Sequence, residues 1–151
     1  MSNAAERAPP ETTANYRWFC DITTRWMDND VYGHINNVTY YSYFDTAANL
    51  YLIREGGLDF SSAKVIAVVA ESKCSYRAPL AYPEALRAGL RVDKLGNRSV
   101  RYGIGIFAGN NEIAAASGTF VHVFVDRASR APVAIPDRIR IALARIIVES
   151  A

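Results

Sequence analysis

Hydrophobic and polar positions alternate along several stretches of the chain, and a period of two predicts strands. In residues 16–25 the apolar side chains fall on every second position. Gly96-Asn97 separates two further alternating stretches and predicts a hairpin turn between them. Together with two continuous apolar stretches, the pattern predicts strands at 16–25, 65–77, 86–95, 99–107 and 112–126.

Residues 37–54 follow a different period, because their apolar side chains recur every three to four positions. The polar positions leave only a narrow stripe, so we expect a mostly buried helix of about five turns. Gly56-Gly57 is expected to end it. The predicted inward side chains are Val38, Tyr40, Tyr41, Phe44, Ala47, Ala48, Tyr51 and Leu52. A second helix is predicted at 138–149, with Asp137 as its N-cap.

One strand, a long helix and four antiparallel strands predict an α+β domain whose helix lies across the sheet. The length of 151 residues suits one domain, expected at 15–151, behind a flexible tail at 1–14. The long helix is too apolar for a single sheet to cover, and 112–126 is apolar on both faces. We therefore expect a homodimer.

Composition narrows the possible functions. The net charge of +2 and the lack of a Lys/Arg block argue against nucleic-acid binding. No apolar run reaches the roughly 18 residues of a membrane span, so no membrane partner is expected. Cys20 and Cys74 have neither metal-ligand nor disulfide spacing, which favours a reducing cytoplasm. No metal or redox cofactor is implied.

The stretch MDNDVYGHINNVTYYSYFD, residues 27–45, gathers polar groups directly before the apolar helix. Taken singly, each has an ordinary explanation, such as a polar loop or, for Asn36, an N-cap. Together they put a carboxylate, an imidazole and a helix N-terminus within a few residues. The helix end suits an oxyanion, and the carboxylate of Asp30 can attack a carbonyl or activate water. A weak base of this kind needs a good leaving group, such as that of a thioester.

Residues 28–41, DNDVYGHINNVTYY, resemble the signature of hotdog-fold acyl-CoA thioesterases, closest to the 4-hydroxybenzoyl-CoA thioesterase branch. The similarity extends over about residues 15–127, with weaker matches at Tyr-Arg-Ala-Pro (76–79) and Gly-Asn-Arg-Ser (96–99). It implies a long helix wrapped by a curved antiparallel sheet. It also implies a homodimer, often a homotetramer, with active sites at the dimer interface.

The resemblance also implies roles for individual residues. Asp30 matches the catalytic carboxylate, as nucleophile or general base, and the Asn37 N–H matches the group that polarises the thioester carbonyl. His34 matches an imidazole that orients water or the carboxylate. The turn at Asn97, Arg98 and Ser99 matches one that meets the phosphates of coenzyme A. The remaining substrate-binding candidates are Tyr32, Gly33, Asn36, Tyr40, Tyr41 and Phe44.

Several residues depart from the family pattern. Tyr32 stands where plant acyl-ACP thioesterases carry an asparagine, and the aromatic-acyl branch lacks a histidine at the place of His34. Another thioesterase branch uses a glutamate on the helix, where this chain has Asp45, more simply explained as part of the polar stripe. Glu71 is a further candidate carboxylate facing the site.

Other reactive residue types have plainer explanations. His122, between two phenylalanines, is expected in the core or an interface, and Cys74 as a small buried residue. The strand charges Arg91, Lys94 and Arg101 are expected to be solvated, or to add to a phosphate site.

The leading prediction is an enzyme that hydrolyses an acyl-CoA to a free acid and coenzyme A, which enters as part of the substrate. Two alternatives stay open. A hotdog enoyl-CoA hydratase pairs aspartate and histidine, but at a spacing that Asp30 and His34 do not match. A non-catalytic acyl-CoA-binding module would keep the fold without needing the carboxylate.

Overall fold

The computed structural model describes residues 9–148. Its elements, in chain order, are η2 (Thr13–Asn15), β1 (Trp18–Thr23), η3 (Trp26–Asp28), α1 (Asn37–Arg54), β2 (Val65–Tyr76), β3 (Ala85–Leu95), β4 (Ser99–Ala108), β5 (Ala116–Asp126) and α2 (Asp137–Ala144). The predicted order of one strand, one long helix and four strands is confirmed. No helix among these residues combines the length and the apolar character that crossing a membrane requires.

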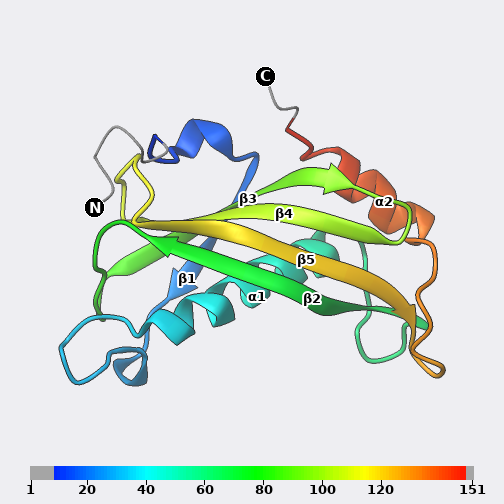
Figure 1. The fold of residues 1–151 in the computed structure, drawn as a ribbon, viewed down its shortest axis with the longest axis horizontal. Coiled ribbons are helices and arrows are strands. Elements are labelled where there is room, and N and C mark those ends of the chain that lie inside the picture. Colours follow the sequence, from blue (N-terminus) through cyan, green and yellow to red (C-terminus); the bar gives the residue numbers. More distant parts are fainter. Residues whose placement is uncertain (1–8, 149–151) are drawn as a thin grey trace, which may run out of the picture.

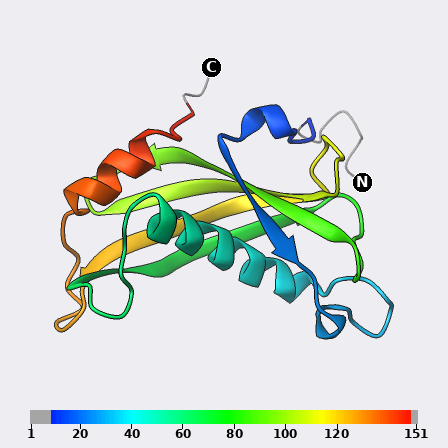
Figure 2. The same ribbon diagram turned by 180° about the vertical axis from the view of Figure 1, so that it is seen from behind.

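The five strands form one antiparallel sheet in the order β1-β3-β4-β5-β2. α1 lies across one face of this sheet (Figure 1; Figure 2). β1 and β2 are therefore the two edges, and β2, with 12 residues, is the longer one. This is the α+β arrangement of a long helix against an antiparallel sheet that the sequence predicted.

The buried side of α1 repeats at intervals of three and four residues. Its buried side chains are Tyr40, Tyr43, Phe44, Ala47, Ala48, Tyr51 and Leu52. Val38, expected on this side, is instead 67% exposed. The reason is geometric, since two positions in a helix turn by about 200° and carry Val38 to the side opposite Tyr40. Gly57 follows the helix with a φ of +67°, which fits the expected glycine stop.

The C-terminal helix is shorter than predicted. α2 ends at Ala144 rather than 149, and residue 149 lies outside the described residues. Its N-cap is Pro136, and Asp137 occupies the first turn without a capping hydrogen bond. After the helix, the chain pairs with β3, because Val92 N–H donates to Ile146 and Val148 N–H donates to Val92. Beyond the end of β1, the edge of β3 is open to this pairing. The chain therefore pairs with β3 instead of continuing as α2.

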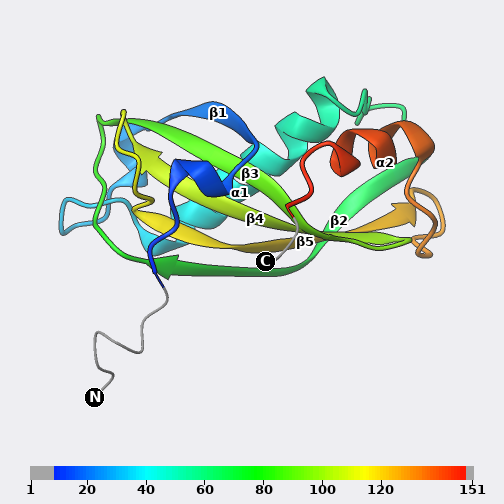
Figure 3. The ribbon, with the colours of Figure 1, turned by 90° about the horizontal axis from the view of Figure 1, so that it is seen from above.

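α2 packs beside the C-terminal half of α1 (Figure 3). The Tyr51 hydroxyl donates to the carbonyl of Ala142, and Ile139 and Leu143 join the same apolar core as α1. Predicted strand residues at 112–115 lie before β5, where Ile113 forms a bridge with Thr12.

The segment expected as a tail contributes to the fold from residue 11 onward. The Glu11 carboxylate pairs with Arg91 at 3.2 Å. Tyr16, expected as the first residue of the first strand, packs with Phe107 and Ala114 in a small cluster of its own. β1 therefore begins at Trp18. Residues 1–8 of the expected tail lie outside the described residues.

Candidate active site

The loop before α1 is folded back on itself by main-chain hydrogen bonds. Asp30 N–H donates to His34 C=O at 2.8 Å, and Gly33 N–H donates to Asp30 C=O at 3.1 Å. Gly33 has a φ of +85°, a conformation in which a side chain would be strained. Asn29 and Ile35 close the loop as an antiparallel bridge. The sequence therefore forms a tight turn that holds Asp30 near the start of the helix.

The N-terminus of α1 leaves one amide available. The Asn36 side chain accepts a hydrogen bond from Val38 N–H at 3.0 Å, so it is the N-cap. Thr39 N–H donates to the Asn36 carbonyl at 2.9 Å. Among residues 9–148, no acceptor is bonded to Asn37 N–H. This amide, at the positive end of the helix, can donate a hydrogen bond to a ligand oxygen.

A pocket of about 380 Å³ brings part of the predicted site together. It is lined by Asp30, His34, Ile35, Asn37, Tyr40, Tyr76, Arg77, Ala78 and Pro79. Four of the twelve residues predicted from the sequence, Asp30, His34, Asn37 and Tyr40, are among them. Asp30 is half-buried and His34 is exposed at the rim. Asp30, whose carboxylate also accepts a hydrogen bond from Tyr32 N–H at 2.8 Å, and Asn37, with its free main-chain amide, therefore line one cavity.

Two aromatic side chains belong to residues that line this pocket. Tyr40 and Tyr76 meet edge-to-face with ring centroids 5.1 Å apart. The Tyr76 hydroxyl also donates to the Asn37 carbonyl at 2.9 Å, so the end of β2 is tied to the first residue of α1. Burial raises the pKa of Tyr40 to about 12, so its phenol stays protonated at neutral pH.

The segment after β2 completes the pocket and is bonded to the Asp30 loop. Ile35 N–H donates to the Leu80 carbonyl at 2.7 Å, and Tyr82 N–H donates to the Asn29 side chain at 2.9 Å. Sequence reasoning did not assign a role to Tyr76 or Arg77 individually. The weak Tyr-Arg-Ala-Pro match was the only signal for them.

Asp28, two residues before Asp30, faces the core instead of the pocket. Its carboxylate accepts hydrogen bonds from Tyr43 Oη at 2.7 Å and from Arg25 N–H at 2.9 Å. The Arg25 guanidinium lies 3.3 Å away. The Asp28 side chain is only 2% exposed. The resemblance in residues 28–41 assigned the catalytic role to Asp30, but no local pattern showed that Asp28 turns inward, because that depends on Tyr43.

The other predicted binding residues lie outside the pocket lining. Tyr32 is 85% exposed, and Gly33 and Asn36 serve the turn and the helix cap. Tyr41 is half-buried beside Phe44. Phe44 is fully buried and packs against the backbone at Gly118, so the interior of a single chain behind the pocket is filled. Their roles in binding stay predictions.

The predicted phosphate-binding turn at Asn97, Arg98 and Ser99 lies at the opposite end of the sheet. Ser99 pairs with Val123 on β5, and Val123 pairs with Val68 on β2. Val68 precedes Tyr76 by eight positions, and about 3.3 Å per residue makes the separation about 26 Å. Within one chain, the turn is therefore remote from the pocket.

The remaining reactive residues lie outside the pocket lining, and several of them are buried or bonded to other side chains. His122 is 1% exposed, bonds the Tyr102 hydroxyl through Nδ1 at 3.1 Å, and has its pKa lowered to about 4 by burial. Burial raises the pKa of the Cys74 thiol to about 11, which opposes a nucleophilic role. Asp45 is exposed and accepts from the Asn49 amide, and Glu71 is exposed on β2 outside the pocket lining. Arg91 is engaged with Glu11 and Asp93, not freely solvated.

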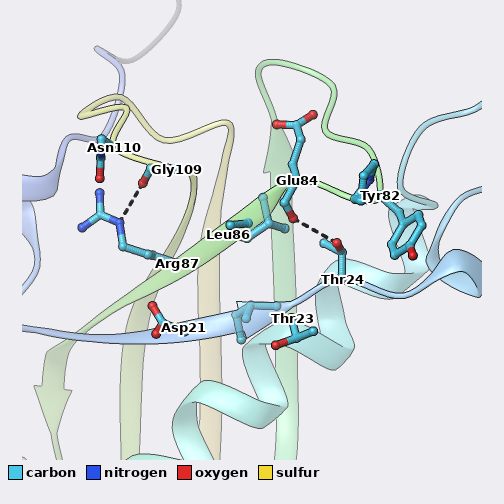
Figure 4. Close-up of a pocket in the computed structure, with 12 residues that line it drawn as sticks. Asp21, Thr23, Thr24, Tyr82, Glu84, Leu86, Arg87, Gly109 and Asn110 are labelled. Atoms are coloured by element: carbon cyan, nitrogen blue, oxygen red, sulfur yellow. Dashed lines mark hydrogen bonds between the residues drawn. The ribbon is translucent and has the colours of Figure 1, made fainter.

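A second hollow of about 650 Å³ lies beside β1 (Figure 4). The side chains of Asp21, Glu84 and Arg87 reach it from β1, from the loop before β3 and from β3. Arg87 donates to the Gly109 carbonyl at 2.9 Å and lies over the Phe19 ring. None of the predicted site residues lines this hollow, and no helix begins in it.

A family model for the thioesterase-like superfamily matches residues 24–143. The chain belongs to the thioesterase-like superfamily. This confirms the resemblance found in the sequence and the hotdog fold, and it supports thioester hydrolysis as the chemistry of the chain.

The proteins similar to this chain include solved structures that share its fold and a relative found by sequence. The PA5185 protein of Pseudomonas aeruginosa strain PAO1 is 52% identical, with a TM-score of 0.91 over 92% of this chain and 97% of that chain. A thioesterase of Thermus thermophilus, in complex with coenzyme A and zinc, is 27% identical, with a TM-score of 0.71 over 85% and 98% of the two chains. YsmA of Bacillus subtilis (strain 168) is 26% identical over 90 residues, which span 60% of this chain and 60% of that protein.

Proposed function

We propose that this thioesterase-like protein is an acyl-CoA thioesterase, which converts an acyl-CoA and water into a carboxylic acid and coenzyme A. The observation that carries this proposal is the shared pocket of the Asp30 carboxylate and the free Asn37 amide. Coenzyme A as the thiol component is supported by the Thermus thermophilus thioesterase, whose structure contains it. In this proposal, no step is assigned to a metal or redox group.

In this mechanism the thioester carbonyl oxygen accepts a hydrogen bond from Asn37 N–H. The positive end of α1 stabilises the negative charge that develops on that oxygen during attack. Asp30 either attacks the carbonyl carbon or removes a proton from an attacking water. His34, at the rim, is suited to orient that water. The carbon–sulfur bond then breaks, and the sulfur leaves as the thiol of coenzyme A.

A homodimer would bring the predicted phosphate-binding turn within reach of the pocket. β2 is a long edge strand whose outer hydrogen-bonding groups are open among the described residues, and such an edge favours pairing with another strand. Antiparallel pairing with β2 of a second copy would set the end carrying Tyr76 beside the start of the other β2. In the second copy, the predicted phosphate-binding turn is about 26 Å from the pocket of the same chain. The pairing would place that turn on the side of the first copy's pocket. A tetramer would need an additional interface.

Replacement of Asp30 by asparagine tests the proposed function. Asp30→Asn keeps the size of the side chain but removes the nucleophile and base, so we expect thiol release to fall at least about 100-fold. Asp45→Asn is the matched control, because Asp45 is exposed on the polar side of α1. Both variants should unfold at the temperature of the wild type, within a few degrees.

Thiol release is measured across short, long, branched and aromatic acyl-CoA esters, with enoyl-CoA hydration followed in parallel. Full turnover by Asp30→Asn would refute the proposed role of this carboxylate. Hydration without thiol release would indicate the hydratase instead, and tight binding without either reaction would indicate a binding module.

A further inference from the structure

Arg77 is a positively charged residue of the candidate active site, and its guanidinium forms no contact that stabilises the fold. Arg77 lines the same pocket as Asp30 and Asn37, and it also lines a neighbouring hollow together with Glu11 and Ser75. Its main chain is fixed, because Arg77 N–H donates to the Ala115 carbonyl at 2.8 Å. No carboxylate among residues 9–148 lies within ion-pair distance of its guanidinium, and no hydrogen bond from that group is formed there. Its donors are therefore available to a ligand.

Arg54, Arg101 and Arg138 likewise form no side-chain hydrogen bond or ion pair among residues 9–148, but Arg77 is the arginine that lines the pocket of Asp30. Some other arginines hold the fold together. Arg91 donates to Glu11 and Asp93, and Arg140 donates to the carbonyls of Gly96 and Asn97. These guanidinium groups hold segments of the fold together. The guanidinium of Arg77 does not, although the neighbouring residue, Tyr76, ties β2 to α1.

The position of Arg77 indicates which part of a substrate it meets. A thioester carbonyl bonded to Asn37 N–H would lie in the cavity that Arg77 also lines. The long pantetheine arm of coenzyme A separates its phosphates from the thioester, so those phosphates lie well outside that cavity. A negative group that meets Arg77 therefore belongs to the acyl part. The edge-to-face pair of Tyr40 and Tyr76 lines this cavity of about 380 Å³, which favours a compact acyl group.

On the basis of the thioesterase function proposed above, we propose that Arg77 selects acyl groups with a carboxylate at their far end. The substrate class is the coenzyme A monothioester of a short dicarboxylic acid. Guanidinium and carboxylate match as a bidentate pair, which fixes the acyl chain as well as attracting it. Hydrolysis adds water across the carbon–sulfur bond and yields the free dicarboxylic acid and the thiol of coenzyme A.

Two esters of equal carbon number test this inference. Succinyl-CoA and butanoyl-CoA differ in the terminal carboxylate, which replaces a methyl group. We expect the wild type to have a kcat/KM for succinyl-CoA about tenfold or more above that for butanoyl-CoA, the value of one charge-assisted pair. Arg77→Gln should remove this preference, through a loss on succinyl-CoA with less than about a twofold change on butanoyl-CoA. Arg77→Lys, which keeps the charge without the fork, should retain part of it.

Arg145→Gln is the control for the loss of one positive charge, since Arg145 is exposed at the end of α2, far from the pocket. Its selectivity should equal that of the wild type. An equal loss on both esters in Arg77→Gln, or no loss on either, would overturn the role given to Arg77.

The two proposals fail in different ways. If the wild type releases thiol from neither ester nor from any other acyl-CoA, the thioesterase function is wrong. Calorimetric binding of both esters to the wild type and to Arg77→Gln still tests the residue in that case. Weaker binding of succinyl-CoA alone would support its role, and unchanged binding would refute it.

Discussion

The Tyr43 hydroxyl donates a hydrogen bond of 2.7 Å to the buried carboxylate of Asp28. This contact joins the start of the Asp30 loop to the second turn of α1. Asp28 also holds the end of that loop, because Asn36 N–H donates to the Asp28 carbonyl at 2.9 Å. In the Asp-Asn-Asp sequence, the first aspartate therefore fixes the loop, and the second faces the pocket.

Tyr43→Phe should destabilise the protein and displace the loop, because it removes a hydrogen bond to a buried charge. We expect the free energy of unfolding to fall by about 1.5–3 kcal/mol, measured by urea denaturation. The kcat for a good thioester substrate should fall with little change in KM. Tyr82→Phe is the control, since no hydrogen bond to the Tyr82 hydroxyl is formed within residues 9–148. Equal stability of Tyr43→Phe and wild type would contradict this account.

Tyr76→Phe should affect catalysis more than folding. The lost hydrogen bond to the Asn37 carbonyl is partly exposed, so the cost in stability should be about 0.5–1.5 kcal/mol. Without it, the first turn of α1 is less firmly held beside the pocket, and we expect a several-fold lower kcat. Steady-state kinetics at saturating substrate measure this effect. An unchanged kcat would show that the hydroxyl does not help to position Asn37.

Gly118→Ala should disrupt the contact between β5 and β2. An added Cβ would lie 1.8 Å from the Lys73 carbonyl oxygen and 2.9 Å from the Phe44 ring, so main chain would have to move. We expect destabilisation of about 2 kcal/mol or more. Gly109→Ala is the comparison, because its φ is +49° but no atom lies within 4 Å of the new methyl group. Only backbone strain of about 1 kcal/mol should appear there. Thermal unfolding distinguishes the two variants.

Stability should decrease in acid through His122. Burial lowers the pKa of His122 from 6.5 to about 4, so the folded state favours the neutral ring. The resulting stability is complete above the unfolded pKa of 6.5 and is lost as pH falls towards 4, by about 3 kcal/mol in total. His122→Gln should be less stable at pH 7 but should flatten this part of the pH profile. Urea midpoints between pH 7 and 4 measure it, with the exposed His34→Gln as control. A profile unchanged by His122→Gln would rule out this histidine as the cause.

Local patterns in the amino-acid sequence were enough to define the elements and the kind of site. Periods of two and of three to four record which side of each segment is buried, and this information is local. The same holds for Asn36, whose cap bond reaches only two residues, and for the turn at Gly33. Membership in the superfamily was likewise visible in residues 28–41.

Which side chains meet was set by the three-dimensional fold. The inward turn of Asp28 depends on Tyr43. The contact of Tyr76 with Asn37, and the position of Arg77 in the pocket lining, depend on the register of β2 against the rest of the sheet. The end of α2 was set by the free edge of β3, at a distance that no local pattern records. Contacts between residues far apart in the chain are fixed by packing and strand pairing, so they appear only when the whole core is assembled.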